Sequence, residues 1–170
     1  MNVGVCTTDF PTLPAEELFA KIAELGFSSV QLCFGSVAET NFACSPHFDI
    51  PACIPEEAVS AIRSAAEKHR LDIVACNGTF NMAHPNPEIR TEGLKRFEAV
   101  ARATARLGIS YISLCSGTLS EVSMWSPHPQ NSSEIAWENM RSTMEAAVKI
   151  AERFGIVLAI ETEAANVIDT

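Results

Sequence analysis

The sequence lacks the features that would assign it to several large classes of protein. No apolar run approaches the length of a membrane span. Met1 to Gly4 carry no basic region before an apolar stretch, so we do not expect a signal peptide. Lys and Arg number 12 against 21 Asp and Glu, and the basic residues are scattered. The formal net charge of −9 therefore argues against nucleic acid and anionic membrane surfaces as partners.

Cysteine pairs at metal-binding or redox spacing are also missing. The six cysteines show no CxxC pattern, and most lie inside apolar runs, where a free thiol behaves as a small hydrophobic group. A reducing cytoplasm is the location that this usage predicts. No glycine-rich phosphate-binding fingerprint follows any of these runs.

Short apolar runs that end at a similar place recur along the chain. Four of them end in cysteine and the fifth ends in Glu161; they cover residues 3–6, 30–33, 73–76, 112–115 and 157–161. Turn-prone or glycine-containing segments follow the runs. In folds built from such units, the chemistry gathers at the carboxyl ends of the strands. Glu161, the only carboxylate in the series, is therefore the first candidate for a functional residue.

Helical patterns separate these strands. Apolar residues recur at helical spacing in residues 14–25, 55–69, 87–107 and 133–154. Gly26, Gly108 and Gly155 follow three of these helices and are expected to adopt the left-handed conformation of a C-cap.

The alternation of strands and helices predicts an α/β fold with a parallel sheet covered by helices. An open doubly wound sheet and a (β/α)8 TIM barrel both fit. A barrel needs eight of each element and about 250 residues, whereas this chain has five predicted strands and four predicted helices. We therefore interpret residues 1–170 as the N-terminal portion of a single (β/α)8 domain, with apolar surface exposed on its inner side. Asn166, with Asp169 three residues later, predicts the start of a further helix.

Candidate functional residues lie at and beyond the strand ends. Glu163 follows Glu161 by two residues and so points to the same side of the chain. Paired carboxylates suit divalent metal binding and proton transfer. His84, in the third loop, is a candidate substrate contact, and Trp125, in the fourth, could stack on a sugar or cap the core. His128 has no visible partner, and the strand-end thiols lack the nearby ligands of a zinc site.

Three segments of the chain resemble the sugar phosphate isomerase/epimerase family, part of the xylose-isomerase-like TIM barrel superfamily. These are residues 74–85 (VACNGTFNMAHP), residues 114–118 (LCSGT) and residues 158–161 (LAIE). The resemblance extends over the whole chain but covers only the first five of eight strands. The glutamate that ends the fifth strand is its most specific element.

The resemblance implies a catalytic and metal-binding role for Glu161. In this family the residue binds a divalent metal, such as Mn, Mg, Co or Zn, and moves a proton to or from a sugar carbon. It also implies that His84, Trp125 and Asn166 line the pocket for a sugar or sugar phosphate. The family's other ligands, an Asp, a His and a second Glu, lie on strands six to eight, so we expect the chain alone to be inactive.

Two alternatives stay open at this point. The superfamily also contains metal-dependent abasic-site endonucleases, which need histidines at strand ends three and four. This chain has Cys76-Asn77 and Cys115-Ser116 there. The second alternative is a non-catalytic half-barrel whose open strand edges assemble with a partner chain or with another copy as a homo-oligomer.

Overall fold

Strands and helices alternate along the chain in the predicted order. The computed structural model describes residues 3–43 and 45–170, so Met1 and Asn2, part of the segment considered for a signal peptide, lie outside the described residues, as does Cys44. The main elements are β1 (Gly4–Cys6), α1 (Ala15–Glu24), β2 (Ser29–Leu32), α2 (Glu56–His69), β3 (Asp72–Asn77), α3 (Pro87–Arg106), β4 (Tyr111–Cys115), α4 (Glu134–Arg153) and β5 (Val157–Glu161). No helix in the described part of the chain combines the length and the apolar character needed to cross a bilayer.

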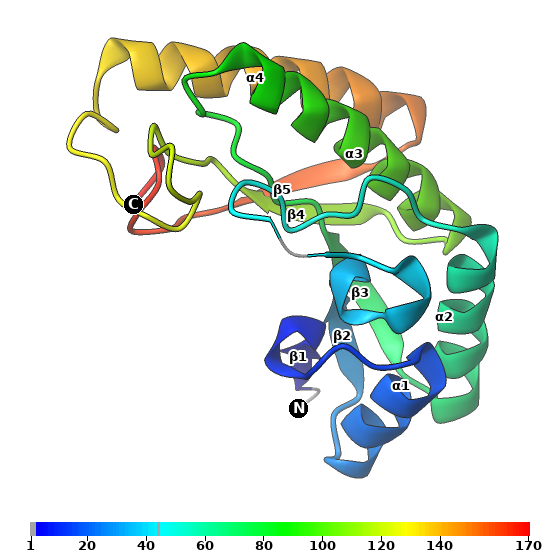
Figure 1. Ribbon diagram of the computed structural model, residues 1–170. Coiled ribbons are helices and arrows are strands. Elements are labelled where there is room, and N and C mark those ends of the chain that lie inside the picture. Colours follow the sequence, from blue (N-terminus) through cyan, green and yellow to red (C-terminus); the bar gives the residue numbers. More distant parts are fainter. Residues whose placement is uncertain (1–2, 44) are drawn as a thin grey trace.

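The five strands form one parallel sheet in the order β1-β2-β3-β4-β5. Figure 1 shows α1 to α4 following one another along the same side of this curved sheet. A doubly wound sheet would carry helices on both faces. The arrangement is therefore that of a partial TIM barrel, and the predicted barrel fold is confirmed.

The two faces of the sheet differ sharply in exposure. Val30, Leu32 and Ile112 point toward the helices and are fully buried. Tyr111 and Val157, which pair with each other on the inner face, are 53% and 54% exposed. The main core thus fills the layer between sheet and helices, and apolar surface is exposed on the inner side, as expected from the sequence.

A β-bulge in β3 changes which side chains reach the inner face. The register pairs Val30 with Ile73 but Gln31 with Ala75, so Val74 is one extra residue. Beyond the bulge Cys76 pairs with Leu32 and points toward the helices, where Thr104 of α3 contacts its thiol. Burial raises the pKa of Cys76 to about 12. Cys76 therefore lies at the same rim as the other strand ends, with its thiol directed toward the helices rather than toward the barrel interior.

The helix ends explain how the chain reverses between layers. Gly26, Gly108 and Gly155 have positive φ angles of 85°, 77° and 68°, which confirms the predicted C-caps. After α2 the same conformation is taken by Arg70, with φ of 55°. At the other end of α3, the Asn86 side chain accepts a hydrogen bond from the backbone N–H of Glu88.

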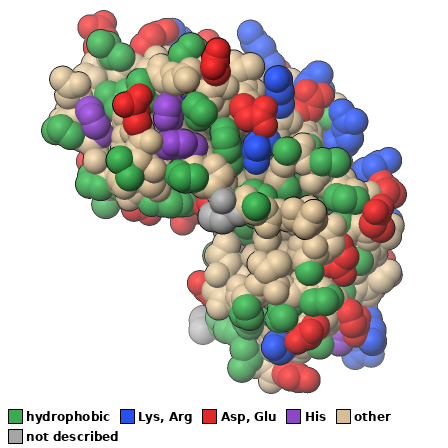
Figure 2. All heavy atoms as spheres, viewed as in Figure 1, with side chains coloured by type: hydrophobic (Ala, Val, Ile, Leu, Met, Phe, Trp, Pro, Cys, Tyr) green, Lys and Arg blue, Asp and Glu red, His purple; other side chains and the backbone are tan. Residues whose placement is uncertain are grey.

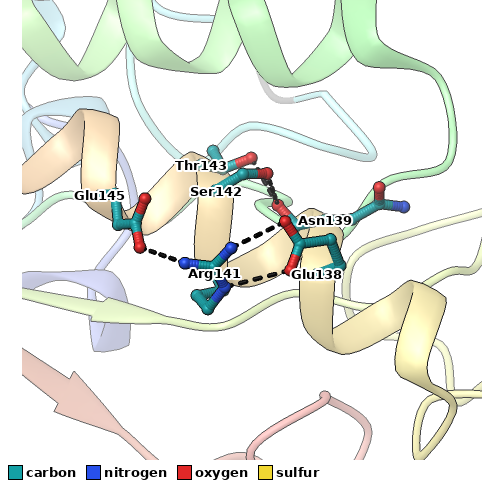
Figure 3. Close-up of polar contacts among 6 residues, drawn as sticks. All are labelled: Glu138, Asn139, Arg141, Ser142, Thr143 and Glu145. Atoms are coloured by element: carbon teal, nitrogen blue, oxygen red, sulfur yellow. Dashed lines mark hydrogen bonds and ion pairs between the residues drawn. The ribbon is translucent and has the colours of Figure 1, made fainter.

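Helix α4 has one charged and one apolar flank. Figure 3 shows Arg141 between the carboxylates of Glu138 and Glu145 on this helix. The apolar flank forms a groove of about 500 Å³ beside β5, and its lining includes Trp137, Met140, Met144, Val148, Ile160 and Ile168. In the described part of the chain, the outer edges of β1 and β5 pair with no other strand.

The predicted helix start at Asn166 is wrong. Residues 164 and 165 form a turn, and the backbone N–H of Asn166 donates to the carbonyl of Glu163. Instead of capping a helix, the segment folds back onto the loop after β4: Val167 N–H donates to Gly117 O, and Ile168 N–H donates to Ser116 Oγ.

Candidate active site at the carboxyl ends of the strands

Glu161 lies on the inner face at the end of β5. The β4–β5 register pairs it with Cys115, and residues paired in this way point to the same face of the sheet. The charge of Glu161 contributes to raising the pKa of the Cys115 thiol to about 11, after burial as the main cause. It also raises the pKa of Cys6 on β1, after burial and Asp9. Glu161 therefore lies on the concave side of the sheet, where it is exposed.

Glu163 lies close to the same thiol. Its charge, too, raises the pKa of Cys115, more weakly than that of Glu161. Its backbone is held by hydrogen bonds from Glu163 N–H to Ile168 O and from Asn166 N–H to Glu163 O. Both charges therefore act on the Cys115 thiol, but Glu163 lies beyond the end of β5, so the strand register does not set the side to which it points.

Several inner-face side chains near the strand ends are polar and bond to one another across the sheet. The Gln31 amide donates to Ser113 Oγ at 2.8 Å, and so joins β2 to β4 across β3. Such a contact requires a concave sheet. Asn77 takes the inner place at the end of β3, where its amide donates to Cys33 Sγ at 3.8 Å. These contacts place polar groups on the inner face near the strand ends.

Trp125 lies in the loop after β4 and reaches across to the loop after β2. Its side chain is 45% exposed. The indole N–H favours the charged form of the Asp49 carboxyl group, although desolvation outweighs it and raises the pKa of Asp49 overall. Trp125 therefore does not cap the core, and an aromatic side chain with a carboxylate beside it remains open to the solvent.

Asn166 uses both ends of its side chain to hold backbone. Oδ1 accepts from Gly117 N–H at 2.7 Å and Nδ2 donates to Met124 O at 3.0 Å. The residue is 3% exposed. It thereby fixes the loop that carries Trp125, while the sugar contact predicted for it stays a prediction.

His84 is buried in the loop after β3 and contacts a second histidine. Its ring lies 4.5 Å from that of His47 in an edge-on arrangement, and its Nδ1 accepts from Asn86 N–H at 3.0 Å. Figure 2 shows histidine side chains gathered at the upper left of the molecule, with acidic side chains beside them. No contact joins His84 to Glu161, so its role in the sugar pocket also stays a prediction.

The pKa of His84 is lowered, and this predicts a pH dependence of stability. Desolvation is the main cause, His47 and Arg90 act in the same direction, and the Asn86 backbone and Glu121 oppose them. The folded protein therefore binds a proton at His84 less readily than the unfolded chain, in which a histidine has a pKa of about 6.5. Stability should fall as the pH drops below that value and level off below the folded pKa, at about 1.4 kcal/mol for each unit of difference.

Urea unfolding between pH 7.5 and 5 measures this effect. His84→Gln should flatten the dependence. His128→Gln is the matched control, because His128 Nδ1 also accepts from the backbone N–H two residues later. An unchanged slope in His84→Gln would show that other groups cause the acid sensitivity.

The thiols and carboxylates of the described residues do not assemble into a complete metal site. No group of three His, Cys, Asp or Glu side chains in this part of the chain is placed to hold an ion. The five cysteines that the structure describes are all free. Glu161 and Glu163 are therefore at most a partial ligand set.

Asp49 is a carboxylate near the strand ends that the sequence did not single out. It lies in a long loop without a periodic pattern, and only the packing of three loops brings it to the mouth. The Phe48–Phe80 bridge and the hydrogen bond from Asp49 N–H to Thr79 O set its position. The length of the loop was the one available signal, because loops of this size in compact domains are often functional.

Comparison with known proteins identifies one family whose sequence model covers most of the chain. The sequence model of the family described as "Xylose isomerase-like TIM barrel" matches residues 19–170. A search of curated proteins finds no match.

Several solved structures share the fold over 95% of the chain. A D-tagatose 3-epimerase-like protein is 19% identical, with a TM-score of 0.69 and 53% of its own length covered. A 3-keto-D-glucoside 4-epimerase from E. coli is 19% identical, with a TM-score of 0.67 and 56% covered. A xylose isomerase domain protein from Alicyclobacillus acidocaldarius is 14% identical, with a TM-score of 0.64 and 50% covered.

The chain thus spans about half the length of the solved structures that it matches. At these identities the structures support the fold alone, whereas the sequence model covers most of the chain. The chain belongs to the xylose isomerase-like TIM barrel family.

Proposed function

We propose that this chain contributes the proton-transferring carboxylate of a sugar or sugar phosphate isomerase/epimerase. The observation that carries the proposal is the position of Glu161, a carboxylate on the inner face at the end of β5. In TIM barrels the catalytic groups lie at this end of the strands. The names of the structural neighbours, a D-tagatose 3-epimerase-like protein and a 3-keto-D-glucoside 4-epimerase, agree with sugar chemistry.

The reaction that fits this carboxylate begins with removal of a proton from the carbon beside the sugar carbonyl. The electron pair of the C–H bond forms a carbon–carbon double bond, and the carbonyl π electrons move to oxygen, which gives an enediolate. Return of a proton to the neighbouring carbon, together with transfer of the hydroxyl proton to the former carbonyl oxygen, completes an aldose–ketose isomerisation. Return to the opposite face of the original carbon completes an epimerisation. In this proposal Glu161 performs one of these transfers, and a second acid or base performs the other.

A divalent metal is part of the proposal for the whole enzyme. It would stabilise the negative charge that develops on the sugar oxygens. The described residues do not form a complete site for it. Among them, we propose Glu161 as a ligand. Glu163 is the second carboxylate to test, because its charge also acts on the Cys115 thiol.

The remaining candidate residues have distinct proposed roles. Trp125 is exposed at the mouth and offers its ring to the sugar. Asn166 holds the Trp125 loop through Gly117 and Met124. His84 is the residue for which contact with substrate has the least support, because its polar neighbours belong to its own loop and to His47.

No observation favours the abasic-site endonuclease alternative. The inner positions at the ends of β3 and β4 are occupied by Asn77 and Cys115 rather than by histidines. The formal charge of −9 is unfavourable for DNA binding. The non-catalytic half-barrel remains the outcome to expect if the whole protein converts no sugar.

A panel of sugars tests the proposed function. We expect the whole protein that carries this chain to interconvert at least one pair among D-fructose, D-tagatose, D-psicose and their aldose isomers, free or phosphorylated. Activity should require Mn²⁺, Mg²⁺, Co²⁺ or Zn²⁺ and be abolished by EDTA. The 170-residue chain alone should be inactive. Turnover that survives chelation would contradict the metal requirement, and the lack of any turnover would contradict the function.

A further inference from the structure

The turn after β5, residues 163–168, is docked onto the loop after β4. Val167 N–H donates to Gly117 O and Ile168 N–H donates to Ser116 Oγ, both at 2.8 Å. Figure 1 shows the red C-terminal segment beside the loop that leads from β4 to α4. The backbone of the turn is therefore held by hydrogen bonds to a neighbouring loop.

Asn131 joins these two segments from a third position. It lies two residues before Ser133, the N-cap of α4. Its Oδ1 accepts from Thr118 Oγ1 and from Leu119 N–H, each at 3.0 Å, in the loop after β4. Its Nδ2 donates to Ala165 O at 2.8 Å in the turn after β5. One side chain thus ties the start of α4 to the loop and to the turn.

The docked turn begins two residues after Glu161. In the described part of the chain β5 pairs with β4 alone, so one side of the strand has no backbone partner. The end of such a strand opens easily unless the segment that follows is held. The register with Cys115 fixes Glu161 on its strand, and the turn is closed by the hydrogen bond from Glu163 N–H to Ile168 O at 3.2 Å. Asn131 holds this closed turn in place.

The position of Asn131 requires both a donor and an acceptor. Thr118 and Leu119 present donors to it, and Ala165 presents a carbonyl oxygen. An amide satisfies both sides, whereas an ionised carboxylate only accepts. An aspartate here would keep the bonds to the loop and place an oxygen against the Ala165 carbonyl.

We propose that Asn131 is a positioning residue for proton transfer by Glu161, because it fixes the turn after β5 on the loop after β4. The inference rests on the proposed function and adds a residue that supports its carboxylate. In this role Asn131 contacts no reacting atom.

Asn131→Asp tests this role by steady-state kinetics of the whole protein, with the sugar pair that the wild type converts. It should lower kcat about 10- to 100-fold with little change in KM, because a small displacement of a reacting group costs this much. Asn139→Asp is the matched control, since Asn139 of α4 also donates to a loop carbonyl, Ala83 O, at 3.5 Å. Gln130→Glu adds the same charge beside Asn131 and keeps the bridge. A loss in either control equal to that in Asn131→Asp would overturn the proposal.

A double-mutant cycle with Glu161→Gln separates positioning from a general structural effect. If Asn131 acts through Glu161, Asn131→Asp should lower kcat little further once Glu161 has been replaced. Multiplying fold-losses in the double variant would overturn the proposal.

Amide hydrogen exchange gives a readout that does not depend on turnover. In Asn131→Asp the amides of Val167 and Ile168 should exchange about 10-fold faster or more, relative to those of α1, whereas Asn139→Asp should leave them unchanged. Unchanged exchange in Asn131→Asp would overturn the anchoring. Faster exchange with wild-type kcat would overturn the positioning role and leave the proposed function intact. Faster exchange in a protein that converts no sugar would contradict the proposed function and confine Asn131 to anchoring the turn.

Discussion

Glu161→Gln is expected to lower the rate of sugar interconversion by about 10²- to 10⁴-fold, the range that general acid–base catalysis contributes. The change keeps the size of the side chain but removes its charge and its ability to accept a proton from carbon. Because the residue is exposed on the inner face, the fold should tolerate the substitution. The measurement is kcat/KM for the sugar pair that the wild type converts, at saturating metal.

Two further glutamine variants make this result specific. Glu24→Gln changes an exposed glutamate at the end of α1, far from the strand ends that carry the site, and should leave kcat/KM unchanged. Glu163→Gln tests the carboxylate that shares the surroundings of Cys115 with Glu161. If Glu161→Gln retained wild-type kcat/KM while Glu163→Gln lost it, the catalytic role would belong to Glu163.

Gly117→Ala is expected to destabilise the protein by about 2–6 kcal/mol. Gly117 has φ of 78°, where a residue other than glycine costs about 1–3 kcal/mol. An added Cβ would also lie 2.4 Å from Asn81 Oδ1 and 2.7 Å from the backbone nitrogen of Met82. Overpacking of this kind costs about another 1–3 kcal/mol. Urea unfolding with unchanged m values gives the difference in the free energy of unfolding.

Gly108→Ala provides the matched control for this loss. Gly108 has nearly the same φ, 77°, but an added Cβ would have no atom within 4 Å. Its cost should therefore be limited to the backbone conformation. Equal losses in the two variants would show that the contact between the β3 and β4 loops has little rigidity. A larger loss at Gly117 would support the tight packing of these loops, which also places Trp125.

The fold could be predicted because its signals are local. Each buried strand is a short apolar run, and Gly26, Gly108 and Gly155 mark the ends of three helices through the conformation that glycine alone adopts easily. The bulge at Val74 could not be predicted in this way, since nothing in the run of apolar residues shows which of them is unpaired. Because of that bulge, Cys76 faces the helices rather than the barrel interior.

The position of one candidate residue was predictable for a similar reason. The inner-face position of Glu161 could be predicted because position along a strand determines which face a side chain takes. Asn166 was misassigned as a helix cap because its local pattern fits one, whereas its amide is used by Gly117 and Met124 far away in the sequence. Asp49 depends on the packing of three loops, which leaves no pattern in the sequence.

Solvent deuterium incorporation during turnover tests most directly whether Glu161 transfers a proton. In D₂O with added Mn²⁺ or Mg²⁺, NMR of the products made by the wild-type protein should show deuterium at the carbon where the configuration or the carbonyl position changes. The Glu161→Gln variant should incorporate it more slowly by the same factor as its loss of turnover. Turnover without deuterium in the product, or incorporation at the wild-type rate in the variant, would contradict proton transfer by Glu161.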